Sequence, residues 1–126
     1  NTKMIKLNKH PLLITTKYQT ASHRELRLLV SGSGVRIGVS IQRLYFPEHK
    51  GNLYYQFIEI KGIKYLLLTT KIQPNYYTAS NLNNTGYILG NACVRALLYE
   101  SKPHYYILEF EKTDNKDILA FKLVKQ

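Results

Sequence analysis

The chain has 126 residues, of which 44% are hydrophobic, and 18 Lys and Arg against 8 Asp and Glu give it a formal net charge of +10. This length fits a single compact domain over residues 1–126 and excludes two domains of ordinary size. The sequence has no apolar run of about eighteen or more residues and opens with no signal-peptide pattern. These absences exclude a membrane-spanning helix, so we expect an intracellular, cytoplasmic protein with no membrane partner.

The first third of the chain is predicted to be mostly strand. Residues 12–18 and 25–30 are short apolar segments, and Ser-Gly-Ser-Gly at 31–34 is a tight turn because glycine tolerates positive φ. Apolar residues then alternate with small or polar ones over 35–41, which is the period of a strand with one apolar face. Residues 39–46 can also form one or two helical turns, which Pro47 would end.

A β-hairpin completes each half of the chain, and the second half offers another short helix. Residues 53–60 lead through Lys61-Gly62 into 63–68, and 104–110 lead through a polar turn into 118–124. Both are predicted β-hairpins because of their β-branched and aromatic residues and their turn residues. Residues 91–99 occupy the place of the second short helix.

Two segments of the chain are nearly identical. Residues 12–19 read LLITTKYQ and residues 66–73 read LLLTTKIQ, and Thr-Ala-Ser follows the first directly and the second after four residues, PNYY at 74–77. Order and spacing also agree beyond these words, so we expect two repeats, about 12–65 and 66–126, that share one core.

A glycine in each half is followed nine residues later by an arginine, Gly34 by Arg43 and Gly86 by Arg95. Strand, glycine turn, strand, short helix with Arg, and hairpin together resemble the swapped-hairpin barrel of AbrB-type regulators, which MraZ-type proteins carry in tandem. Neither copy has the family's Arg directly after the glycine, although Arg36 lies one place further on, and both lack the family's Pro and helical Glu.

The resemblance implies a mainly β fold with one or two short helices, arranged as an internally duplicated, pseudo-dimeric β-barrel of the DNA-binding type. It also implies a transcription regulator that contacts duplex DNA largely through the DNA backbone and the groove shape. One duplicated chain would supply what two subunits supply in the family, as a monomer or a homodimer.

The distribution of charge favours the same partner. Residues 1–47 carry eight basic side chains and only Glu25, whereas residues 48–126 carry ten basic and seven acidic side chains. An excess of cations gives salt-sensitive affinity for phosphates, so we predict nucleic acid as the partner, with duplex DNA favoured. The candidate nucleic-acid-binding residues flank the glycine turn or occupy matching repeat positions: Lys17, Arg24, Arg27, Arg36, Arg43, Lys71 and Arg95.

Several of these residues have simpler structural interpretations. Arg43 and Arg95 can cap their helices or pair with Glu48 and Glu100, and Gly34 can be only a turn glycine. The adjacent tyrosines at 54–55, 76–77 and 105–106 suggest a platform for stacking single-stranded DNA or RNA. Neighbouring strand residues point to opposite faces, however, so one tyrosine of each strand pair is expected in the core.

Catalysis is not predicted. A small basic ribonuclease would need an acid and a base, for which His23, His49 and His104 are the available groups, but no catalytic motif surrounds them. The histidines and Cys93 have no metal-ligand spacing, so neither metal nor cofactor is expected. A protein-interaction module stays open as a further alternative.

Overall fold

The computed structural model of the chain describes residues 4–13, 27–31, 34–99 and 102–125. Within them lie eight strands, two short α-helices and one 3-10 turn. The strands are β1 (Arg27–Ser31), β2 (Gly34–Gly38), β3 (Leu53–Ile60), β4 (Ile63–Thr69), β5 (Tyr77–Asn81), β6 (Gly86–Leu89), β7 (His104–Glu111) and β8 (Leu119–Lys125). The helices are α1 (Ser40–Tyr45) and α2 (Ala92–Leu98), and the 3-10 turn is η1 (Leu7–Lys9).

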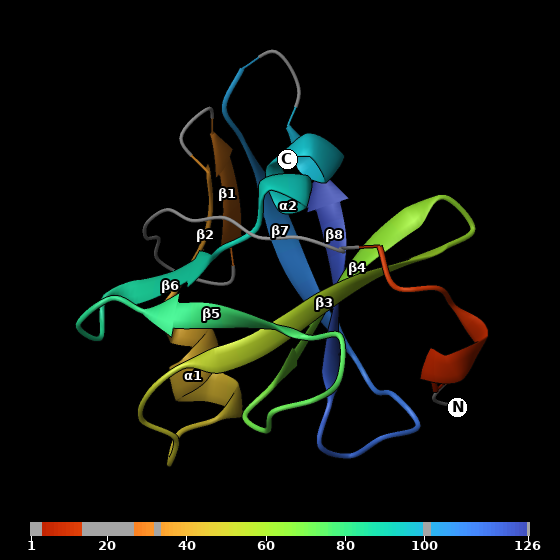
Figure 1. Ribbon diagram of the computed structural model, residues 1–126, viewed down its shortest axis with the longest axis horizontal. Helices are drawn as coiled ribbons and strands as arrows, with labels where there is room; N and C mark the ends of the chain where they lie inside the picture. The colour runs from red at the N-terminus through yellow and green to blue at the C-terminus, as the bar shows by residue number, and fades with distance from the viewer. Residues whose placement is uncertain (1–3, 14–26, 32–33, 100–101, 126) are drawn as a thin grey trace.

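The strands close into one antiparallel barrel in the order β1-β2-β6-β5-β3-β4-β8-β7, and β7 pairs with β1 to complete it. In the view of Figure 1, β3 and β4 pass in front of β7 and β8. The expected mainly β barrel with two short helices is confirmed. The barrel joins strands from both halves of the chain, so the two halves share one core.

The predicted hairpins form as β3–β4 and β7–β8, with seven and six paired positions respectively. Lys61 and Gly62 link β3 to β4 with φ of 51° and 81°. Two successive positive φ values match the right-handed twist of a hairpin with a two-residue turn. The expected strand over 35–41 is shorter, because β2 ends at Gly38 and the helical alternative takes over at Ser40.

The barrel interior is the main hydrophobic core, and it is filled from alternate strand positions. Leu28 and Val30 of β1 point inward with no exposed surface, whereas Leu29 between them is only half-buried. The same period of two holds in β3, where Tyr55 and Phe57 are fully buried in this core.

The two helices lie at opposite ends of the barrel, as Figure 1 shows. Each follows directly after one of the antiparallel neighbours β2 and β6, and antiparallel neighbours end at opposite edges. Ile41 of α1 and both Val94 and Leu98 of α2 enter the main core. The helices therefore help to close the ends of the barrel.

The segment 4–13, which we name the arch, lies against the outer face of the barrel. Ile5 forms a bridge with Thr113 at one foot, and Leu12 forms a bridge with Ile58 at the other. A second, smaller core lies beneath the arch and joins it to β3, β4 and β8. Only Leu12 and Leu13 of the expected strand over 12–18 are described, and the rest of that prediction lies outside the described residues.

No helix among the described residues is both long enough and apolar enough to cross a membrane.

Candidate nucleic-acid interface

Two of the predicted cations, Arg27 on β1 and Arg36 on β2, share one patch of the barrel's outer face. Leu29 lies directly opposite Arg36 in the β1–β2 ladder, and Arg27 is two residues before Leu29 on the same face of its strand. Such diagonal neighbours are roughly 7 Å apart. Both side chains are half-buried and point away from the core. We call the outer face around Arg27 and Arg36 the arginine face.

Arg27 is held over an aromatic ring. Its guanidinium carbon lies 5.3 Å from the ring centroid of Tyr105 on β7, and Tyr105 faces Leu29 across the β1–β7 ladder. The ring face attracts the cation. Arg27 is therefore oriented before any ligand arrives.

Arg36 is set among apolar neighbours. It lies between Leu29 on one side and Ile88 of β6 on the other, and Ile88 is only 9% exposed. Burial lowers the pKa of the Arg36 guanidinium from its usual value, because removal of water disfavours the charged form. The group still carries its charge at neutral pH, and a phosphate bound beside it is screened less than one bound to a fully solvated cation.

The strands that form this side of the barrel carry no carboxylate. β1, β2, β5 and β6 contain no Asp or Glu, and their charged side chains are Arg27 and Arg36. The described acidic residues lie on other strands and loops: Glu48, Glu59, Glu109, Glu111, Asp114 and Asp117. These four strands therefore carry a formal charge of +2.

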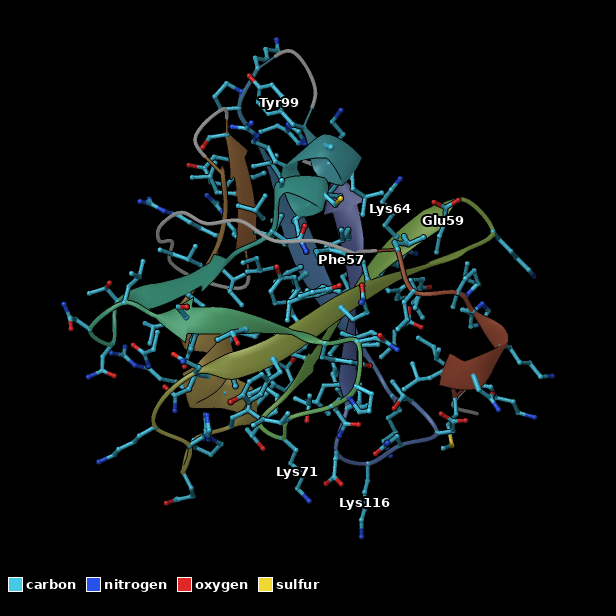
Figure 2. The ribbon with its side chains drawn as sticks, in the orientation of Figure 1. Phe57, Glu59, Lys64, Lys71, Tyr99 and Lys116 are labelled. Atoms are coloured by element: carbon cyan, nitrogen blue, oxygen red, sulfur yellow. The ribbon has the colours of Figure 1, made fainter. Side chains whose placement is uncertain are left out.

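The other predicted cations are not gathered on the arginine face. Arg43 is exposed on α1 and pairs with no described carboxylate, whereas Arg95 is half-buried on α2 at the opposite end of the barrel. Lys71 donates a hydrogen bond of 3.2 Å to Asp117 in an exposed ion pair, and Figure 2 shows it at the same end of the barrel as Lys116. Lys17 and Arg24 lie outside the described residues.

The tyrosine pairs follow the expected alternation on β3 and β7, the two strands that contain both members of a pair, whereas Tyr76 precedes β5 and only Tyr77 belongs to it. Tyr55 is fully buried while Tyr54 is half-buried, and Tyr106 packs against the core while Tyr105 lies under Arg27. Tyr105 was missed as a partner of Arg27 because the β1–β7 pairing joins residues far apart in the chain. The sequence indicated only that one tyrosine of this pair would face outward, because neighbouring strand residues point to opposite faces.

The rings of two described histidines lie beside backbone carbonyls. The His49 ring lies 2.6 Å from the carbonyl oxygen of Asn52, and the His104 ring lies 3.2 Å from that of Lys102. No group of three or more His, Cys, Asp or Glu side chains that could hold a metal ion is found among the described residues.

The fold and the arginine face define a class: a closed eight-stranded β-barrel with two short helices and a cationic outer patch. Comparison with known protein families, curated proteins and solved structures finds no match to this chain. The resemblance to AbrB-type proteins stays a prediction.

Proposed function

We propose that this protein binds duplex DNA through the arginine face. The observation that carries the proposal is that Arg27 and Arg36 lie on one outer patch of the barrel. Tyr105 orients Arg27, and neither β1 nor β2 carries a carboxylate. Guanidinium groups bind phosphate oxygens in two-point fashion, and two of them fixed on a rigid sheet favour a regularly spaced array of phosphates.

The limited accessibility of the tyrosine rings favours duplex over single-stranded nucleic acid as the partner. Single-strand binding needs aromatic faces on which bases can stack. One face of Tyr105 is taken by Arg27, and the buried Tyr55 and packed Tyr106 offer no platform. The outer surface of a closed barrel is also convex, which suits contact with a duplex backbone or groove better than enclosure of a flexible strand.

An internal duplication supports the same partner and belongs to the proposal. The order β-β-α-β-β occurs twice along the chain, and the repeat glycines Gly34 and Gly86 begin β2 and β6 with φ of 141° and 157°. Arg36 and Ile88 each lie two residues after these glycines and face each other across the β2–β6 ladder. A pseudo-twofold axis through that pair would place Arg36 near the axis, where it could meet the dyad of duplex DNA.

The test is a salt series of fluorescence anisotropy titrations with a labelled duplex, the matching single strand and the matching RNA. We expect the duplex to bind most tightly, and affinity to fall steeply with salt. The double variant Arg27→Gln with Arg36→Gln should lower the slope of log affinity against log salt by about two, because each phosphate contact contributes roughly 0.9.

The matched control removes two exposed lysines outside the arginine face, Lys50→Gln with Lys116→Gln, and should lower the slope by less than about one. Arg36→Lys keeps the charge but loses the two-point geometry, so it should retain the salt slope while weakening the affinity, which separates the charge from the geometry of the guanidinium. Tighter binding of the single strand, cleavage of the RNA, or equal effects of the two double variants would overturn the proposal. Absence of binding in every arm would favour a protein-interaction module.

A further inference from the structure

A second cationic site lies on another part of the barrel, between the arch and the tip of the β3–β4 hairpin. The cleft there has a volume of about 380 Å³, within the usual range of roughly 300–1,000 Å³ for small-ligand sites. Lys6 and Lys9 reach it from the arch, Lys61 reaches it from the hairpin turn, and Glu111 on β7 is the carboxylate in its lining. Its lining also includes His10, Ile60 and Tyr65.

Backbone hydrogen bonds anchor the arch to the barrel on both sides of Lys6 and Lys9. The backbone N–H of Ile5 donates to the Lys112 carbonyl at 3.0 Å, and the Asp114 N–H donates to the Ile5 carbonyl at 2.8 Å. At the other foot the Leu13 N–H donates to the Phe57 carbonyl at 2.8 Å. The chain between these feet, which carries Lys6 and Lys9, is therefore held against the barrel by backbone hydrogen bonds on both sides.

The three cleft lysines are not neutralised by ion pairs with the described carboxylates. Lys6, Lys9 and Lys61 are exposed and form no ion pair with a described carboxylate, whereas Lys64 on the same hairpin pairs with Glu59 at 3.6 Å. Figure 2 shows Glu59 and Lys64 close together on the hairpin. Three lysines against Glu111 leave a formal charge of +2 in the lining, with His10 neutral.

The floor of the cleft has a different character from its rim. Ile60 is half-buried and Tyr65 is 8% exposed, so the floor presents an apolar chain and an aromatic ring. Burial, and secondly the charge of Glu111, raise the pKa of the Tyr65 hydroxyl, so this hydroxyl stays protonated and Glu111 lies near it. A ligand here would meet the lysine ammonium groups at the rim, and the Glu111 carboxylate beside the Tyr65 ring at the floor.

We propose that this cleft binds a nucleoside monophosphate, with the phosphate among Lys6, Lys9 and Lys61 and the nucleoside against Ile60 and Tyr65. Lysine ammonium groups suit the oxygens of a phosphate dianion, because each presents rotatable donors on a flexible stem. Glu111 repels the phosphate from the floor and accepts a hydrogen bond from a sugar hydroxyl or a base amino group. The same unit can come from a free nucleotide or from the 5′-phosphorylated end of a nucleic acid chain.

The experiment is a calorimetric titration of the full chain with adenosine 5′-monophosphate, adenosine and inorganic phosphate, followed by amide NMR shifts. We expect saturable binding of the monophosphate, with shifts at residues 6–10 and 61–65, and at least tenfold weaker binding of adenosine, which lacks the charged group. The variant Lys9→Gln with Lys61→Asn should weaken the monophosphate by about tenfold or more. Asn tolerates the positive φ at position 61, so the hairpin turn is retained.

Lys116→Gln is the matched control, since Lys116 is an exposed lysine that lies outside this cleft. It should leave the affinity for the monophosphate within about twofold of the starting protein. Equal losses in Lys116→Gln and in the cleft variant, or shifts that never saturate, would overturn the site as a general charge effect. Equal binding of adenosine and its monophosphate would overturn the role of the lysines.

A second pair of probes separates the two sources of the ligand. A single-stranded oligonucleotide with a 5′-phosphate is compared with the same oligonucleotide ending in a 5′-hydroxyl. Tighter binding of the phosphorylated strand, lost in the cleft variant, assigns the site to nucleic acid ends. Equal binding of the two strands alongside saturable monophosphate binding assigns it to free nucleotides.

Discussion

Tyr55 lies fully buried inside the barrel, and its hydroxyl has no hydrogen-bond partner among the described residues. Its ring is well packed, with an edge-to-face contact to Phe57 at 6.1 Å between centroids. A buried hydroxyl without a partner costs about 1–3 kcal/mol relative to water, whereas the ring itself contributes to the core. Replacing Tyr55 with Phe keeps the ring and removes the cost.

We expect Tyr55→Phe to raise the free energy of unfolding by about 1 kcal/mol, which corresponds to a rise in Tm of roughly 3–5 °C for a chain of this size. The effect should grow at alkaline pH. Burial and, secondly, Tyr77 raise the pKa of Tyr55 above its usual value. The hydroxyl of folded Tyr55 therefore stays protonated at a pH where that of the unfolded chain ionises. This ionisation leaves the free energy of unfolding unchanged below about pH 10 and lowers it as the pH rises further, at about 1.4 kcal/mol per unit.

Urea unfolding followed by circular dichroism at pH 7 and at several values between 9 and 11.5 measures both effects. Above about pH 10 the Tyr55→Phe variant should lose stability less steeply than the starting protein. Tyr54→Phe is the control, because the neighbouring Tyr54 is half-buried on the outer face and should change stability by less than about 0.5 kcal/mol. If Tyr55→Phe lowered stability at pH 7 by about 1 kcal/mol or more, the hydroxyl would have a bonding partner and the reasoning would be wrong.

Three further changes test the packing, a helix cap and a surface ion pair. Phe57→Ala should cost about 3–5 kcal/mol in urea unfolding because the ring is fully buried, and Phe57→Leu should cost clearly less. Asn91→Ala should cost about 1 kcal/mol, since the Asn91 side chain accepts a hydrogen bond from the Cys93 N–H at 2.7 Å and caps α2; an unchanged Tm would contradict this role. Asp117→Asn should change stability by less than about 1 kcal/mol, because the Lys71–Asp117 pair is exposed, and a larger loss would show that the loop depends on it.

The local parts of this fold could be predicted because each is encoded by neighbouring residues. The β3–β4 hairpin follows from β-branched and aromatic residues on both sides of the turn residues Lys61 and Gly62, and both hairpins form where expected. The short helices also form where their segments were expected to turn. In each case the signal spans fewer than about ten residues, which is the range over which periodicity and turn chemistry act.

The closure of the barrel and the position of the arch could not be predicted from the same signals. β1 pairs with β7, so Leu29 meets Tyr105 across most of the chain, and no local pattern specifies that register. Of the strand expected over residues 12–18 only Leu12 and Leu13 are described, and no sequence pattern predicted the 3-10 turn or the two isolated bridges that hold the arch. The cleft beneath it depends on this tertiary packing, and so the cleft lysines had no sequence signature beyond their charge.

Matching spacing in two halves of a chain also does not imply that the matched side chains meet. Arg43 and Arg95 have the same offset from their glycines, but α1 and α2 extend from antiparallel neighbours and carry these arginines to opposite ends of the barrel. Residues with the same offset occupy equivalent positions in the two halves. Whether two equivalent positions are close together depends on how the halves are arranged in space. In the proposed pseudo-twofold arrangement, only residues near the axis, such as Arg36, lie close to their counterparts.

The proposed duplication is therefore unequal in charge. Leu28 faces Ile37 in the first hairpin and Ala79 faces Leu89 in the second, and Ile37 and Leu89 each lie three residues after a repeat glycine. Arg27 is consequently matched by the residue before Ala79, which is a neutral threonine. The first half thus supplies both arginines of the arginine face while β5 and β6 complete the barrel beside them. We therefore expect the proposed complex with duplex DNA to contact the two strands of the duplex unequally.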